Sequence, residues 1–288
     1  MATLFGASEA ERLRRLSFNF YMAPPDCDIA RFCAMAAEHG VGGVGLTARA
    51  MEAMPPEALA RLLRAHGLRC TSLNSTGYVL HADAGAAAAQ ARLDDLLFAA
   101  APALDAPINV ILGGTLHGAT AGMPALPLRT ARAMAAEGLG RLAMRARNAG
   151  ARLALEPMHP TALGTKGCVN QVSHAVALAA RHAEVGLTLD FHHSWWDEDL
   201  APAIAAAPRD ILVVQICGQF VPADGGAARR AELAAGPADL GTFLRDLDAA
   251  GYGGAVEYEV FWDQMGEPDL AGLLDRAVRD FLALTRDA

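Results

Sequence analysis

Four side chains that carry oxygen interrupt apolar stretches in the second half of the chain. Each stands at or near the end of a short hydrophobic run: Glu156, Asp190, Gln215 and Glu259. Burying one carboxylate without a partner is costly, and bringing three together is worse unless a divalent cation neutralises them. An all-oxygen set of donors suits Mn²⁺, Mg²⁺ or Co²⁺ better than a structural zinc ion. These positions therefore predict a divalent metal site, with Mn²⁺ as the expected ion.

The elements that must position these residues alternate between strand-like and helical patterns. Short apolar runs predict eight strands: Leu16–Tyr21, Gly43–Leu46, Arg69–Leu73, Asn109–Leu112, Arg152–Glu156, Gly186–Asp190, Ile211–Ile216 and Ala255–Phe261. Longer segments with helical periodicity lie between them: Ile29–His39, Pro56–His66, Ala86–Ala101, Leu128–Asn148, Val169–His182, Leu240–Ala250 and Asp269–Thr285. Strands that alternate with helices indicate parallel βαβ units.

Eight such strands in 288 residues predict an α/β fold, a single (β/α)8 TIM barrel that spans residues 1–288. No Gly-rich dinucleotide-binding turn follows the first strand, and no linker divides the chain. In a TIM barrel the loops after the C-terminal ends of the strands build the active site. The four oxygen-bearing residues are therefore expected to meet at one mouth of the barrel.

Composition argues against several classes of protein. A net charge of −8 with scattered arginines disfavours a nucleic-acid-binding surface. No uncharged apolar stretch reaches about 18 residues, so a membrane span is not expected, and the N-terminal segment lacks the apolar run of a signal peptide. The five cysteines include no CxxC pair, which predicts neither a disulfide framework nor a cysteine zinc site. We expect a cytoplasmic protein.

Three motifs on these predicted strands together resemble those of a known superfamily. They are LEPMHP at residues 155–160, DFHHSWWD at residues 190–197, and GYGG at residues 251–254 followed by Glu259. They are similar to the metal-glutamate, Asp-x-x-His and closing motifs of the xylose-isomerase-like TIM-barrel superfamily, the sugar phosphate isomerase/epimerase group. The resemblance implies Glu156, Asp190 and Glu259 as metal ligands. It also implies that His193 is an active-site residue in contact with metal or substrate.

Gln215 departs from the family pattern, which usually has a histidine at this position. Glutamine also occurs there in a branch that resembles bacterial 3-dehydroshikimate dehydratases. Because Gln is uncharged, as neutral His is, three carboxylates still face the divalent ion and the amide supplies a harder oxygen donor. The resemblance implies an isomerase or epimerase acting on a ketose or keto-polyol, in which Glu156 and Glu259 act as general acid and base around an enediolate. The alternative is a lyase, a dehydratase or β-eliminase, that uses the same site.

Two further readings of the sequence are less favoured. An endonuclease-IV-like phosphodiesterase shares the fold, but it requires many more metal-binding histidines and a basic face for DNA. Nine histidines, several of them on predicted helices, and a net charge of −8 argue against it. A non-catalytic barrel that has lost its metal is also conceivable, but the presence of Glu156, Asp190, His193 and Glu259 argues against that reading.

Residues on the same predicted loops are candidates for binding the substrate, expected to be a small carbonyl or polyol compound. We select His159, Lys166, Trp195 and Asn74; Asn19, His81 and His117 could also line the mouth. Lys166 is the only lysine of the chain and lies ten residues after Glu156. Few cations are expected at the mouth, which disfavours a multiply phosphorylated substrate.

The remaining expectations concern the outside of the barrel. Glu257 is expected to face the outer helices and to pair there with an arginine. The alanine-rich helices permit assembly through the helical shell, so we expect a homodimer or homotetramer.

Overall fold

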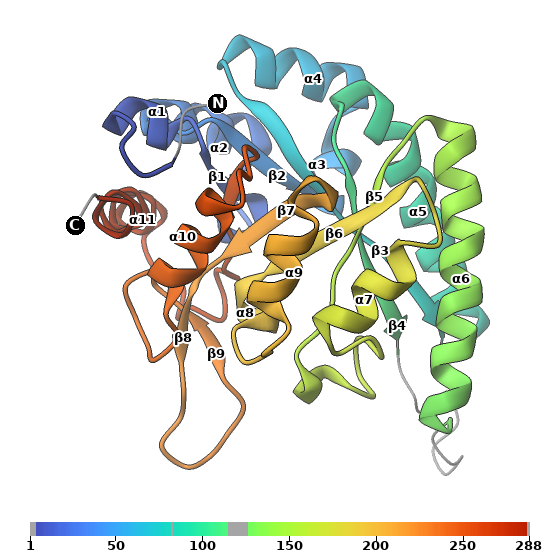
Figure 1. Ribbon diagram of the computed structural model, residues 1–288. Coiled ribbons are helices and arrows are strands. Elements are labelled where there is room, and N and C mark those ends of the chain that lie inside the picture. Colours follow the sequence, from blue (N-terminus) through green and yellow to red (C-terminus); the bar gives the residue numbers. More distant parts are fainter. Residues whose placement is uncertain (1–3, 82, 115–125, 287–288) are drawn as a thin grey trace.

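A closed barrel of eight parallel strands forms the centre of the computed structural model, which describes residues 4–81, 83–114 and 126–286 (Figure 1). The barrel strands are β1 (Leu16–Asn19), β2 (Gly43–Thr47), β3 (Arg69–Leu80), β4 (Ile108–Gly114), β5 (Leu153–Leu155), β6 (Val185–Asp190), β7 (Ile211–Ile216) and β10 (Val256–Tyr258). They follow one another in chain order, and the ring closes where β10 pairs with β1. The predicted (β/α)8 TIM barrel is therefore confirmed.

Helices surround the barrel and connect its strands (Figure 1). The α-helices of the described residues are α1 (Glu9–Leu13), α2 (Ile29–Glu38), α3 (Ala48–Ala53), α4 (Pro56–Ala65), α5 (Ala84–Leu104), α6 (Leu128–Ala149), α7 (Val172–Ala179), α8 (Phe191–Ser194), α9 (Leu200–Ala206), α10 (Leu240–Ala249) and α11 (Leu270–Leu284). Their inward faces bury leucine, phenylalanine and alanine against strands that are themselves buried on both faces.

Some predicted boundaries are wrong. The helix predicted over Val169–His182 begins only at Val172, because the backbone N–H of Met158 bonds the carbonyl of Val169 and the side chain of Asn170 bonds two loop carbonyls. These contacts keep the loop after β5 extended. The last strand ends at Tyr258, three residues earlier than predicted.

The connection after β7 contains a feature that the sequence patterns did not predict. Strands β8 (Gly218–Phe220) and β9 (Arg229–Ala231) form an antiparallel hairpin, which projects at the lower edge of Figure 1. Gly218 is required there, because a Cβ would overlap the backbone carbonyl of Glu232. The hairpin stands at the same end of the barrel as α8, which is the end where β6 finishes (Figure 1).

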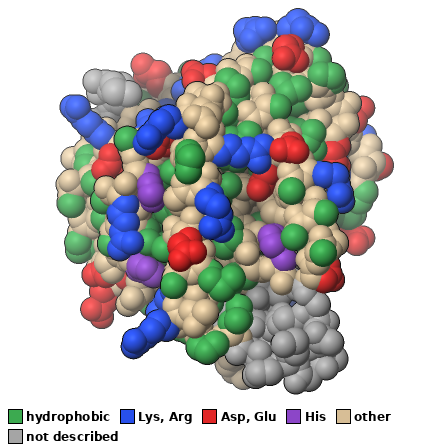
Figure 2. Space-filling view, turned by 90° about the vertical axis from the view of Figure 1, so that its right-hand side faces the viewer, with side chains coloured by type: hydrophobic (Ala, Val, Ile, Leu, Met, Phe, Trp, Pro, Cys, Tyr) green, Lys and Arg blue, Asp and Glu red, His purple; other side chains and the backbone are tan. Residues whose placement is uncertain are grey.

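The surface shows charges of both signs. On the described part of the face in Figure 2, acidic and basic side chains are interspersed, and no continuous basic stripe crosses it. Within the described ranges, no helix combines the length and the hydropathy that crossing a bilayer requires. All five cysteines are buried and unpaired.

Candidate active site

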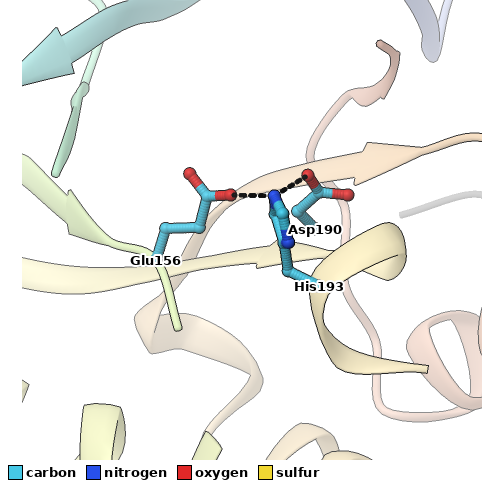
Figure 3. Close-up of side chains that lie close together, drawn as sticks. All are labelled: Glu156, Asp190 and His193. Atoms are coloured by element: carbon cyan, nitrogen blue, oxygen red, sulfur yellow. Dashed lines mark ion pairs between the residues drawn. The ribbon is translucent and has the colours of Figure 1, made fainter. Parts of the chain in front are cut away.

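Asp190 and His193 are brought together by the turn that follows β6. Asp190 is the last residue of the strand, and its carboxylate accepts a hydrogen bond of 2.8 Å from the backbone N–H of His192. This cap starts the short helix α8, which places His193 one helical turn beyond Asp190. The His193 Nε2 atom lies 3.8 Å from Asp190 Oδ2 and 3.8 Å from Glu156 Oε1 (Figure 3).

The hydrogen bond on the other ring nitrogen fixes the chemical role of His193. Its Nδ1 accepts from the backbone N–H of His159 at 3.2 Å, so a neutral ring must carry its proton on Nε2. Burial, together with the nearby Arg230 charge, holds the pKa of His193 well below its usual value, so the ring is neutral. Nε2 is then an N–H donor that faces Glu156 and Asp190. His193 is therefore suited to donate a hydrogen bond, and not to coordinate a metal.

Glu156 follows β5 and is 3% exposed. Its Oε2 accepts a hydrogen bond of 2.6 Å from Asn109 Nδ2, and Asn109 is held in turn by Thr188 Oγ1 at 2.7 Å and by Asn74 Oδ1 at 3.2 Å. Burial and the neighbouring Asp190 raise the pKa of Glu156 to about 7. Asn74 therefore acts on Glu156 indirectly: it holds the Asn109 amide, and Asn109 holds the Glu156 carboxylate.

Glu259 lies beyond β10 and faces the same interior. Its Oε1 accepts from Asn19 Nδ2 at 3.2 Å and from Gln215 Nε2 at 3.0 Å, while its Oε2 pairs with Arg230 at 2.8 Å. Burial raises the pKa of Glu259 to about 8, and repulsion from Asp190, Glu156 and Glu257 acts in the same direction. The Arg230 charge lowers this pKa but only partly offsets these effects. In the metal-free protein, burial and the neighbouring carboxylates therefore raise the pKa values of both Glu156 and Glu259.

Arg230 reaches the site from the β8–β9 hairpin. Its Nη2 lies 2.5 Å from Asp190 Oδ2 and 2.8 Å from Glu259 Oε2, and its guanidinium carbon stands 5.4 Å from the centre of the Phe261 ring. Burial opposes ionisation of Asp190, but the charge and hydrogen bonds of Arg230 outweigh it and hold the pKa of this carboxyl below its usual value. The sequence did not predict this cation, which stands next to the carboxylates at the mouth.

Glu257 corrects another expectation, because it faces the barrel interior and not the outer helices. Its carboxylate accepts hydrogen bonds from Asn19, Thr71, Ser72 and Gln215, and its side chain is 1% exposed. Residues two apart in a strand point to the same face. Glu257 and Glu259 therefore share the inward face, and no arginine pairs with Glu257 within the described residues.

The predicted substrate-binding residues fall in different places. The His159 side chain caps the turn at Thr161 and packs against Trp196, 5.7 Å between ring centres, while its backbone holds His193. Trp195 is partly buried against the core, and its indole N–H has no partner within the described chain. Trp196 donates from Nε1 to the carbonyl of His193 at 3.0 Å, so it also supports that residue.

Lys166 is half-buried on the loop after β5, with its Nζ 6.0 Å from the centre of the Phe261 ring. It lowers the pKa of Glu156, although burial of that carboxyl has the larger, opposite effect. The cationic groups of Lys166 and Arg230 thus both lie near the ring of Phe261. His81 follows β3 and lines a separate surface depression with Gln90 and Arg141, while His117 lies outside the described residues.

Comparison with known proteins identifies the family. The sequence profile described as xylose isomerase-like TIM barrel matches residues 33–282. The chain belongs to this family. No curated protein matches the sequence.

Solved structures resemble this xylose isomerase-like barrel over nearly its whole length. Protein SMc04130 from Sinorhizobium meliloti 1021 is 27% identical with a TM-score of 0.82, over 96% of this chain and 100% of the other. The 3-keto-D-glucoside 4-epimerase YcjR from E. coli is 19% identical with a TM-score of 0.70, over 94% and 98%. The IolI protein with a bound zinc atom is 17% identical with a TM-score of 0.74, also over 94% and 98%. The last two show the shared fold.

The residues of this family member fit a divalent cation. Carboxylate oxygens of Glu156 and Asp190 lie within 4.8 Å of each other, and Gln215 Oε1 is buried without a hydrogen-bond partner among the described residues. The buried carboxylates outnumber the buried cations around them, and the raised pKa values of Glu156 and Glu259 express this shortage of positive charge. A cation bound to these oxygens would supply the missing charge.

Sequence reasoning missed Arg230 and Asn109. Asn109 was the first residue of a predicted strand, and an inward-pointing amide on an otherwise apolar strand was the available signal. For Arg230, the signal was the Arg229-Arg230 pair in a long segment without helical or strand periodicity. Nothing local shows that the second arginine folds back toward Asp190.

Proposed function

We propose that this xylose isomerase-like barrel is a divalent-metal-dependent isomerase or epimerase that acts on a ketose or keto-polyol. The observation that carries the proposal is the pair Glu156 and Glu259. These two buried carboxyl groups come from different strands, face one interior, and have pKa values of about 7 and about 8. Among the structural relatives, YcjR is named as an epimerase of a keto sugar derivative, in keeping with the proposed substrate class.

Glu156, Asp190, Gln215 and Glu259 would hold the metal, with Mn²⁺ as the expected ion. When bound, a divalent ion polarises a carbonyl oxygen and so acidifies the neighbouring C–H group. An all-oxygen donor set is typical of Mn²⁺ and Mg²⁺ sites. The proposed donors are two glutamates, an aspartate and an amide.

The chain's own groups would move the proton. One carboxylate of the pair removes the proton next to the carbonyl, and the enediolate that results is reprotonated by the other carboxyl group or by the same one. His193 Nε2–H would donate a hydrogen bond to a substrate oxygen. Arg230 would keep Asp190 ionised, while Lys166 and Phe261 would form one wall of the pocket. The position at which the proton returns would decide between epimerisation and isomerisation.

A lyase reaction is the second candidate, and the two buried carboxyl groups with raised pKa values favour it. One of them would remove the proton next to the carbonyl, and the protonated other would give its proton to a hydroxyl group that leaves the neighbouring carbon as water, while His193 Nε2–H would donate a hydrogen bond to a substrate oxygen. Proton removal would be the same as in the isomerase, and only the second half of the reaction would differ.

Incubation of purified protein with Mn²⁺ and candidate ketoses in D₂O tests both functions. The isomerase or epimerase predicts solvent deuterium at the carbon next to the carbonyl in recovered sugar, detected by NMR. The lyase predicts a new alkene or enone signal. If a broad panel of ketoses and keto-polyols gives neither exchange nor elimination, the proposed proton abstraction is wrong.

A further inference from the structure

Glu257 is a buried carboxylate that the proposed reaction leaves without a role. Thr71 Oγ1 donates to its Oε2 at 2.6 Å, and Ser72 Oγ donates to both of its oxygens at 3.0 and 2.9 Å. Asn19 Nδ2 donates to its Oε1 at 2.7 Å. Gly45 gives it room, because a Cβ at that position would overlap the carboxylate. Donors on two strands, β1 and β3, thus hold Glu257 in one place.

The amide of Gln215 connects Glu257 to the candidate metal site. Gln215 Nε2 donates to Glu257 Oε1 and to Glu259 Oε1, at 3.0 Å in each case. Both hydrogen bonds run from Nε2, so the NH₂ end of the amide points toward the two glutamates. The Oε1 end then points away from both glutamates. It is fully buried and has no hydrogen-bond partner within the described residues.

We propose that Glu257 is a positioning residue that holds the Gln215 amide with its Oε1 presented to the bound divalent cation. The inference rests on the proposed function, because it explains what orients the Gln215 amide as an oxygen ligand of the metal. Partners behind a metal ligand commonly fix the ligand's orientation and tune its affinity. Without an acceptor at residue 257, nothing fixed would prevent the amide from turning its NH₂ group toward the cation.

Glu257 is better suited to this role than Glu259, which contacts the same amide. In the proposed reaction Glu259 is itself a ligand and exchanges a proton, so its bonds change during turnover. Glu257 contacts no group that is proposed to react, and hydroxyl donors from β3 hold it in place. The orientation of Gln215 therefore depends on the carboxylate that does not take part in the chemistry.

A double-mutant cycle tests the inference through metal affinity. Metal-free wild type, Glu257→Met, Gln215→Ala and the double variant are titrated with Mn²⁺, and free Mn²⁺ is followed by EPR. Glu257→Met removes the acceptor at nearly the same side-chain length, and is expected to weaken binding about 10-fold or more in the wild-type background. In the Gln215→Ala background it is expected to have no further effect, because the group that it positions is gone.

The same cycle separates positioning from simple charge attraction. If removing the negative charge weakens Mn²⁺ binding equally in both backgrounds, Glu257 acts through its charge and the inference is wrong. Glu257→Asp keeps the charge but withdraws the carboxylate by one methylene group. We expect it to weaken binding in the same direction as Glu257→Met, and full Mn²⁺ affinity in this variant would also overturn the inference. Thermal unfolding of each variant verifies that it is folded.

A measurement on the metal-free protein keeps the inference apart from the proposed function. The side-chain NH₂ resonances of Gln215 are assigned by their loss in Gln215→Ala, and their hydrogen exchange is measured by NMR. Protection in the wild type that is lost in Glu257→Met supports the positioning. An unprotected wild-type amide overturns it. If the wild type binds no Mn²⁺ at all, the metal site is wrong, and the ligand role of Gln215 is wrong with it.

Discussion

At the scale of single residues, the site depends on two carboxyl groups whose protonation is delicately balanced. Glu156 and Glu259 are buried. Arg230 forms an ion pair with Glu259, but it acts on Glu156 only by longer-range electrostatic attraction. Their raised pKa values allow one group to be ionised while the other is protonated near neutral pH. This is the condition for one to take a proton while the other gives one.

We expect Glu259→Gln to lower kcat by about 10²–10⁴-fold, because an amide cannot exchange the substrate proton. The rate is measured as solvent deuterium incorporation by NMR. Glu198→Gln is the matched control, since Glu198 is an exposed glutamate on the loop after α8. A Glu259→Gln variant with the rate of this control would exclude Glu259 as acid or base.

The same pKa values predict a pH dependence of stability. Between about pH 6.5 and 8, folded metal-free protein retains protons on Glu156 and Glu259 that the unfolded chain has lost. The free energy of unfolding should therefore fall as pH rises through this range, by at most about 1.4 kcal/mol per pH unit for each retained proton. Below this range, histidines with lowered pKa values contribute in the opposite direction.

Urea denaturation of the metal-free protein at several pH values measures this slope. The control is the double variant Glu156→Gln, Glu259→Gln, in which the fall should disappear. An unchanged slope in that variant would show that other groups titrate in this range.

The sequence predicted the strand-end carboxylates because parallel strands bring their C-terminal ends to one mouth. Asp190 is the last residue of β6, and Glu156 directly follows β5. The orientation of Glu257 was also available from the sequence, since it is two residues from Glu259, and our prediction applied the alternation wrongly. The tautomer of His193 was not available, because it depends on a backbone N–H of another loop.

At the scale of elements, the β8–β9 hairpin brings the strongest positive charge into the site. Arg230 of this hairpin pairs with carboxylates that follow β6 and β10, while Arg229 beside it is exposed. Alternation along a short strand thus sends one arginine inward and its neighbour outward. The hairpin lacked a clear sequence pattern because its strands have three residues each and its connection contains mostly small residues.

We expect Arg230→Gln to destabilise the metal-free protein by about 3–5 kcal/mol, because buried Asp190 and Glu259 lose their counter-charge. Arg229→Gln on the same strand is the matched control and should change stability little. Mn²⁺ should raise the Tm of Arg230→Gln more than that of the wild type, because the cation replaces the lost charge. Equal unfolding free energies for the two variants would contradict this account.

At the scale of the whole molecule, the fold was predictable because its repeating pattern runs the length of the chain. Eight apolar runs separated by helical segments leave few architectures open, and the parallel closed barrel confirms the prediction. The helix boundaries near the mouth were less predictable. There, loop residues such as Asn170 bond backbone groups that are distant in sequence.

Removal of divalent metal should lower the stability of the entire barrel, because the proposed ligands lie on four of its strands or directly after them. A cation that binds only the folded state stabilises it by about 4 kcal/mol at a thousand times its Kd. We expect Mn²⁺ to raise the Tm of EDTA-treated protein by several degrees, measured by calorimetry, with the effect lost in Asp190→Asn. An identical Mn²⁺ shift in wild type and Asp190→Asn would place the binding elsewhere.

The space beside Gly45 links two distant parts of the chain. A side chain at residue 45 and a glutamate at residue 257 cannot occupy the same volume. A substitution at residue 45 therefore requires the Glu257 carboxylate to leave its hydrogen-bonded position or to be replaced. In an alignment of relatives, we expect glutamate at position 257 to occur with glycine at position 45. This pair of residues would then identify the barrels in which a glutamate orients the residue equivalent to Gln215.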